Sequence, residues 1–96
     1  MSIYQLLKSK KNEILKLAEK HGAYNIRIFG SVLRGEDDQK SDIDFLVDIG
    51  KNISSWFPAG LVIDLENLLK IKVDIVTAKA LKERIRDKVL KEAKPL

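Results

Sequence analysis

Three aspartates in strand-like segments are the residues of this chain with the clearest capacity for chemistry. Asp42 and Asp44 stand two positions apart in the segment SDIDFLV, and Asp74 lies in the later segment KVDIV. Side chains two positions apart on a strand point to the same face, with their Cα atoms about 6.6 Å apart, which is close enough to share a cation. If the strand carrying Asp74 pairs with theirs in register, all three carboxylates meet on one patch.

The chemistry of such a patch follows from the cost of placing carboxylates in an apolar setting. A desolvated carboxylate must be paired or bound to a metal ion. Three hard oxygen ligands without histidine or cysteine favour Mg²⁺ or Mn²⁺ over zinc. Carboxylate clusters of this kind hold two ions, about 3.5–4 Å apart, that catalyse in-line displacement at phosphorus. We therefore expect Asp42, Asp44 and Asp74 to bind a pair of Mg²⁺ ions, with Mn²⁺ as the alternative.

A glycine–serine pair supplies a second candidate site. Gly30 and Ser31 directly follow the apolar segment AYNIRIF and open the sequence GSVLRG. Glycine permits a tight turn at the end of a strand, and a short helix beginning there turns its free N–H groups and the serine hydroxyl toward an anion. Arg34 is expected either to reach a phosphate or to pair with a carboxylate. Phosphates beside carboxylates require metal between them, so the two sites together predict binding of a nucleotide's phosphates through magnesium.

A small sheet covered by helices is predicted to position these residues. Apolar residues at helical spacing predict one amphipathic helix of about five turns that begins near Ser2 and ends at Gly22. Alternating and short apolar runs predict three strands, over residues 23–29, 42–49 and 72–76. A second helix is predicted between the last two strands, over residues 61–69.

The last helix completes the predicted architecture. Thr77 is its expected N-cap, and its expected inner face consists of Leu81, Ile85 and Val89. The order helix, strand, strand, helix, strand, helix predicts an α/β (α+β) fold, in which a mixed sheet of three strands or slightly more is flanked by helices. With 96 residues, the chain is expected to be one domain that spans residues 1–96.

The composition is that of a globular domain and excludes several kinds of site. Hydrophobic residues make up 45% of the chain and charged residues 33%, which is not the balance of a disordered segment. The absence of cysteine excludes disulfides, thiolate zinc sites and a cysteine nucleophile. The sequence has no signal-peptide pattern and no apolar run of membrane-spanning length, so we expect a cytoplasmic protein without membrane contact.

Much of the net charge of +4 lies toward the C-terminal end, in KALKERIRDKVLKEAKPL. Such a segment can contact nucleic acid, nucleotide phosphates or an acidic partner, although a solvated helix face is the more common reason for it. Nucleic acid is therefore an alternative partner and not the expected one.

One spacing in this chain resembles the signature of a known superfamily. Gly30 and Ser31, ten intervening residues, and then Asp42 and Asp44 resemble the pattern of the DNA polymerase beta-like nucleotidyltransferases. The segments GSVLRG, SDIDFLV and VDIVTAKAL are similar, in order, to those of the minimal nucleotidyltransferases, the MntA-type antitoxins paired with HEPN-domain toxins. The resemblance extends over about residues 24–86.

The resemblance implies a role for each matching residue and a reaction for the whole. Gly30 and Ser31 would bind the triphosphate of ATP. Asp42 and Asp44 would hold both magnesium ions, and Asp74 would complete the ion nearest the attacking hydroxyl. AMP would pass from ATP to a hydroxyl, a tyrosine of the cognate HEPN toxin, which is thereby silenced. A hetero-oligomer with that toxin is implied as well.

Two other functions stay open beside protein adenylylation. A non-catalytic antitoxin would neutralise its partner by contact alone, with a vestigial or regulatory nucleotide site. Other branches of the superfamily transfer nucleotides to RNA or to a small molecule. The complete set of three aspartates favours chemistry over contact alone. The short chain favours a protein acceptor, because little of it is left to form a second pocket.

Overall fold

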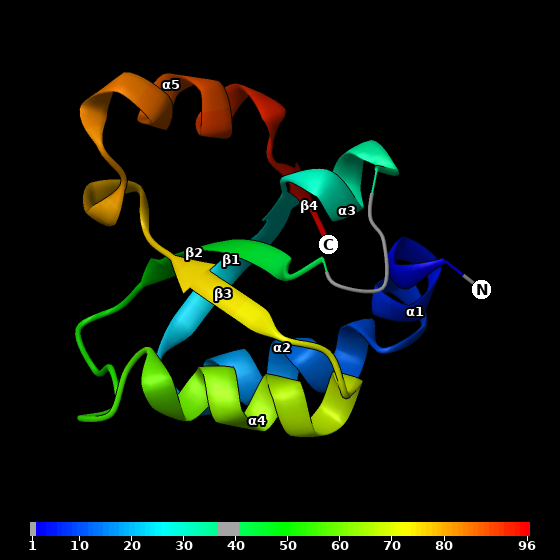
Figure 1. Cartoon of the computed structure of the whole chain (residues 1–96). Coiled ribbons are helices and arrows are strands. Elements are labelled where there is room, and N and C mark those ends of the chain that lie inside the picture. The colour runs from blue at the N-terminus through cyan, green and yellow to red at the C-terminus, as the bar shows by residue number, and fades with distance from the viewer. Residues whose placement is uncertain (1, 37–40) are drawn as a thin grey trace.

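A four-stranded mixed sheet in the order β3-β2-β1-β4 forms the centre of the structure (Figure 1). The structure is a computed structural model and describes residues 2–36 and 41–96. The strands are β1 (Ala23–Phe29), β2 (Ile43–Ile49), β3 (Val73–Val76) and β4 (Lys94–Pro95). β2 is antiparallel to β1 and parallel to β3, and β4 is antiparallel to β1. The predicted α/β fold with a mixed sheet is confirmed, and the sheet has one strand beyond the three located in the sequence.

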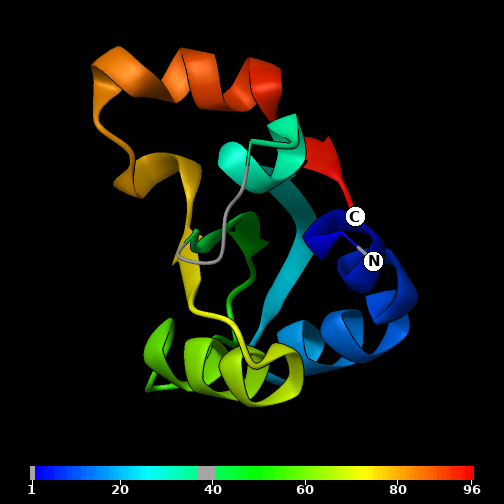
Figure 2. The same ribbon diagram turned by 45° about the vertical axis from the view of Figure 1, so that its right-hand side comes forward.

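Helices lie on both sides of this sheet. They are α1 (Ile3–Ser9), α2 (Lys11–Lys20), α3 (Ser31–Arg34), α4 (Ala59–Leu69) and α5 (Glu83–Glu92), together with the 3-10 turn η1 (Ala78–Ala80). Figure 2 shows α2 and α4 side by side below the sheet and α5 on the opposite side. None of the helices described here combines the length and the apolar character that crossing a membrane requires.

The alternation predicted for β2 is observed. Its core face holds Ile43, Phe45 and Val47, each at most 1% exposed. The opposite face carries Asp44, which is half-buried, and Leu46, which lies in a small second cluster beneath α5. The main core is therefore on the side of α1, α2 and α4, and the aspartate stands on the less covered face, where a ligand can approach it.

The single N-terminal helix that the sequence predicted is in fact two helices that meet at Lys10. Its φ of −103° and ψ of 11° interrupt the helical path, although Leu7 and Ile14 on either side are both buried in the core. The segment 8–13 has no apolar residue, so burial does not require a straight helix there. The predicted start is confirmed, because the Ser2 side chain caps the backbone N–H of the third helical residue.

The start of the last helix also differs from the prediction. Thr77 does not cap α5, because η1 intervenes and α5 begins only at Glu83. Of the predicted inner face, Leu81 and Val89 are buried, whereas Ile85 is 41% exposed. Leu81 precedes the helix, so these three residues do not form one helical stripe, and Ile85 turns to solvent.

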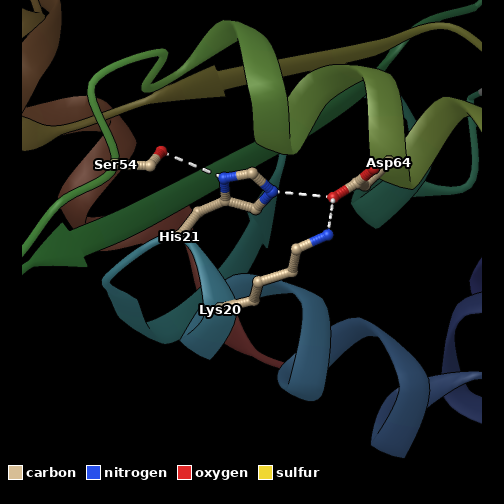
Figure 3. Close-up of polar contacts among 4 residues, drawn as sticks. All are labelled: Lys20, His21, Ser54 and Asp64. Atoms are coloured by element: carbon tan, nitrogen blue, oxygen red, sulfur yellow. Dashed lines mark hydrogen bonds and ion pairs between the residues drawn. The ribbon is translucent and has the colours of Figure 1, made fainter.

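A buried histidine joins the end of α2 to the segment before α4 and to α4 itself (Figure 3). His21 is 8% exposed, its Nδ1 lies 3.0 Å from Ser54 Oγ and its Nε2 lies 2.7 Å from Asp64 Oδ2. Lys20 Nζ lies 3.5 Å from the same carboxylate oxygen. The hydrogen bond with His21, supported by the charge of Lys20, holds the pKa of Asp64 below its ordinary value.

Replacing His21 by Ala is expected to lower the free energy of unfolding by about 2 kcal/mol, because a buried ring and two hydrogen bonds are lost. Lys20→Ala is the matched control, since its side chain is 66% exposed and surface ion pairs contribute less than about 1 kcal/mol. Urea unfolding of both variants measures their free energies of unfolding, and equal losses of stability in the two variants would contradict this prediction.

The stabilisation that the lowered pKa of Asp64 provides should be present above the unfolded pKa of about 4 and lost as the pH falls further.

Candidate active site

The strand register lines up the groups that the sequence singled out. Asp44 of β2 pairs with Asp74 across the parallel ladder and with Phe29 across the antiparallel one. Gly30 follows Phe29 directly, so the turn formed by Gly30 and Ser31, called the glycine turn below, stands in one row with Asp44 and Asp74. The row crosses three neighbouring strands, and adjacent strands lie about 4.8 Å apart. Asp42 comes immediately before β2. The condition on which convergence of the carboxylates depended, pairing of their strands in register, is met.

Gly30 is held against Asp44 in a conformation that only glycine adopts readily. Its φ is +81° and its ψ is −160°, a region strained for residues with a side chain. A Cβ at this position would also lie 2.2 Å from Asp44 Oδ2. Ser31 then begins α3. Glycine is thus required for two independent reasons, the backbone angle and the close approach to the carboxylate.

Asp44 is the electrostatic centre of this row. Burial is the largest cause that raises its pKa, from an ordinary 3.8 to about 6, and repulsion by Asp74 and then by Asp42 adds to it. Arg34 acts in the opposite direction, and Glu92 adds further repulsion. The structure therefore gathers negative charge around one half-buried carboxylate with a single opposing cation among the groups that shift it, an arrangement that attracts a divalent cation.

The three aspartates have the donor chemistry of a magnesium site, because all their ligating atoms are hard carboxylate oxygens. In the described part of the chain, no group of three or more Asp, Glu, His or Cys side chains is arranged to hold a metal ion as it stands. Asp42 and Asp74 are exposed and Asp44 is half-buried. Because like charges repel, we expect their side chains to turn toward one another only when a cation lies between them.

Arg34 makes the second of its two predicted contacts, a pairing with carboxylates. Its Nη1 pairs with Glu92 Oε1, and its Nε lies 3.1 Å from Glu36 Oε2. These hydrogen bonds, first that with Glu92 and then that with Glu36, raise the pKa of Arg34 above its ordinary value. The backbone N–H of Gly30 also donates to Glu92 Oε2, over 3.4 Å. Glu92 therefore contacts both the glycine turn and the arginine of the predicted phosphate site.

Glu92 was not singled out from the sequence, and its place depends on β4. Ile28 of β1 pairs with Lys94 of β4 in an antiparallel register. Two residues after Ile28 is Gly30, and two residues before Lys94 is Glu92, so the same register places these two residues opposite each other. Glu92 is one charge among many on a polar helix, and a two-residue strand has no periodicity to reveal it.

A cavity of about 320 Å³ opens near the C-terminal end of β2. Its lining includes Tyr24, Asp48, Thr77 and Lys79. The described residues that line it do not include Gly30, Ser31, Asp42, Asp44 or Asp74. It is therefore separate from the row of groups formed by the glycine turn and the aspartates.

A glycine–serine turn beside strand aspartates, on a small mixed sheet, has the features of a nucleotidyltransferase. The family model described as "Polymerase beta, Nucleotidyltransferase" matches residues 12–96 of this chain. The chain therefore belongs to the polymerase beta nucleotidyltransferase family, as the sequence resemblance predicted.

Relatives and solved structures agree with this family. Protein adenylyltransferase MntA of Thermococcus cleftensis is 39% identical over 90 residues, which is 94% of this chain and 88% of that protein. A relative from Methanocaldococcus jannaschii is 36% identical over 83 residues, which is 86% of this chain and 89% of that protein.

Solved structures extend the likeness to the fold. A structure described as a minimal nucleotidyltransferase has a TM-score of 0.86 and 41% identity, covering 100% of this chain and 97% of that one. A toxin–antitoxin complex with AMP-PNP has a TM-score of 0.73 and 25% identity, covering 88% of this chain and 70% of that one.

Proposed function

We propose that this protein is a Mg²⁺-dependent protein adenylyltransferase, one minimal nucleotidyltransferase domain over residues 1–96, that acts as an antitoxin. It transfers AMP from ATP to a hydroxyl, a tyrosine, of a partner HEPN-type toxin, with which it forms a hetero-oligomer in the cytoplasm. The single observation that carries the proposal is the row formed by the glycine turn, Asp44 and Asp74. Family membership, a relative named protein adenylyltransferase MntA, and the toxin–antitoxin complex with AMP-PNP support it.

The glycine turn and Arg34 would hold the phosphates of ATP. The Gly30 N–H and the Ser31 hydroxyl donate hydrogen bonds to phosphate oxygens, and the Arg34 guanidinium supplies a positive charge beside them. Asp42, Asp44 and Asp74 would hold the Mg²⁺ ions. Bound Mg²⁺ neutralises charge on the phosphates and on the leaving pyrophosphate.

Transfer would then depend on positioning. The acceptor oxygen attacks the α-phosphorus, the bond from that phosphorus to the oxygen bridging to the β-phosphate breaks, and pyrophosphate leaves. A carboxylate oxygen of Asp74 takes the proton of the attacking hydroxyl. Asp74 is exposed on the edge strand β3, which β2 separates from β1 and the glycine turn, so a residue of another protein can reach it. Holding both reactants in line supplies much of the rate enhancement in such reactions.

Labelling with α-³²P-ATP tests the proposal. The protein is incubated with Mg²⁺ and a lysate of the source cells, and half of each reaction is treated with protease and half with ribonuclease. We expect label that protease removes, and we expect none after excess EDTA, because the phosphates and carboxylates then repel each other without a cation. Label removed by ribonuclease would move the acceptor to RNA and reject protein adenylylation.

A contact-only antitoxin is the second candidate, because a specific observation favours it. Glu92 already binds the Gly30 N–H and Arg34, two of the groups proposed to hold phosphates. A site permanently filled in this way would be vestigial. Neutralisation of the toxin without any labelling, with each of the four nucleoside triphosphates in turn, would support this candidate over the transferase.

A further inference from the structure

The contacts of Glu92 differ from those of an ordinary surface ion pair. Its side chain is 19% exposed, and its two carboxylate oxygens go to different partners, Oε1 to Arg34 and Oε2 to the Gly30 N–H. Proteins commonly bind one edge of a phosphate group in the same way, with a guanidinium and a backbone N–H each donating to one of two oxygens. Among the described residues, the only ion-pair partner of the Glu36 side chain is Arg34, and that side chain is 63% exposed.

The position of Glu92 is also unfavourable for the glutamate itself. It lies close enough to Asp44 for the two carboxylates to repel each other, and Asp44 is further repelled by Asp42 and Asp74. A carboxylate placed there for stability alone would be better located away from other negative charges. The same position suits a phosphate group that arrives with its own cations, because those cations cancel the repulsion.

We propose that Glu92 is an internal competitor of the nucleotide: its carboxylate occupies the position of a phosphate between the Gly30 N–H and Arg34, and it must leave before ATP binds. This inference rests on the function proposed above. Only the side chain has to move, because the backbone beyond it is held by β4 and by the hydrogen bond from the Leu96 N–H to the Ile26 carbonyl, 3.0 Å. Glu92 therefore weakens nucleotide binding and makes it depend on a cation-bearing polyphosphate.

Direct binding of a non-transferable nucleotide tests this competition. The dissociation constant of α,β-methylene-ATP with Mg²⁺ is measured by titration calorimetry for the wild type and for Glu92→Gln. If the closed arrangement is about 90% populated, removing it should tighten binding by roughly tenfold. Glu92→Asp should also tighten binding, because the shorter side chain keeps the charge but no longer reaches the Gly30 N–H.

The matched control is Glu36→Gln, which removes a carboxylate from Arg34 without touching Gly30. Its dissociation constant should stay within about twofold of the wild type, as expected for an exposed pair. Thermal unfolding of each variant shows whether it is folded, and Glu92→Asp carries the test if Glu92→Gln is not. If the wild type binds the nucleotide and neither Glu92 variant binds it more tightly, this inference is overturned and the proposed function still stands. Absence of binding by every protein would overturn both.

Discussion

Replacing Asp44 by Asn should greatly slow nucleotidyl transfer while making the metal-free protein more stable. Activity should fall by roughly 10³-fold, the scale seen when one group that stabilises transition-state charge is lost. Asn is nearly the same size as Asp but has no charge for Mg²⁺, so its effect on transfer is electrostatic. The labelling reaction with purified partner measures the loss. Transfer retained within tenfold of the wild type would remove Asp44 from the catalytic machinery.

The opposite effect on stability follows from the sign of the pKa shift. Folding raises the pKa of Asp44 from 3.8 to about 6, so the folded protein holds this proton more tightly than the unfolded chain does. Between about pH 4 and pH 6 the wild type loses stability, and above pH 6 the full penalty remains. The shift alone corresponds to about 3 kcal/mol. Because Asp44 is only half-buried, solvent screening reduces the expected gain from Asn to about 1–2 kcal/mol at pH 7.5.

Urea unfolding in EDTA at pH 4 and at pH 7.5 checks this prediction, because the advantage of Asp44→Asn should be larger at the higher pH. Asp48→Asn is the matched control on the same strand and the same face. Asp48 accepts hydrogen bonds from Arg27, 2.7 Å, and from Asn25, 2.9 Å, so its replacement should destabilise the protein. Destabilisation by both variants would show that Asp44 is a structural residue like Asp48.

Replacing Gly30 by Ala is the second change with a large expected effect. The added Cβ must occupy a φ of +81° and would lie 2.2 Å from Asp44 Oδ2, so the turn or the aspartate has to move. We expect the free energy of unfolding to fall by about 2–3 kcal/mol, from backbone strain and from the clash. Transfer should fall by roughly 10²-fold, because small displacements of positioning groups are costly to catalysis.

Gly35→Ala is a control for a side chain placed at positive φ without a clash. Gly35 has a φ of +72° and a ψ of 21°, which is the left-handed helical region, and a Cβ there would meet nothing within 4 Å, so only backbone strain of about 1 kcal/mol is expected. In an Asp44→Ala background, Gly30→Ala should cost less than it does in the wild type, because the clashing carboxylate is gone and only the backbone strain of a φ of +81° and a ψ of −160° remains. Urea unfolding gives these differences. Equal costs for the two glycines in the wild-type background would refute the close approach.

Much of the candidate site could be predicted from the sequence because its signals are local. Gly30 and Ser31 directly follow the short apolar run predicted as the first strand, and Asp42 and Asp44 lie at the start of the second predicted strand, where apolar residues alternate. The class of fold followed from the order of elements, since each has its own periodicity. Helix boundaries were less accurate, because the interruption at Lys10 leaves the burial pattern on both sides intact.

Asp74 shows what the sequence could predict about the candidate site and what depended on the tertiary structure. The sequence predicted that Asp74 lies on a strand. It could not predict whether that strand pairs with the strand of Asp44. The observed parallel pairing depends on the crossover through α4, whose buried residues select one position over the sheet. Register between strands distant along the chain is decided by such packing and by no local pattern.

The sequence by itself determined the family, the glycine turn and the aspartates, because these are carried by residue types at short separations. Only the tertiary structure decided the position of Glu92, which reaches Gly30 because the short strand β4, more than 60 residues later in the chain, pairs with β1. It likewise decided that His21 would be buried between Ser54 and Asp64. Contacts of this kind join residues that are far apart in the chain, and loop closure and core packing, which select them, leave no short-range signal.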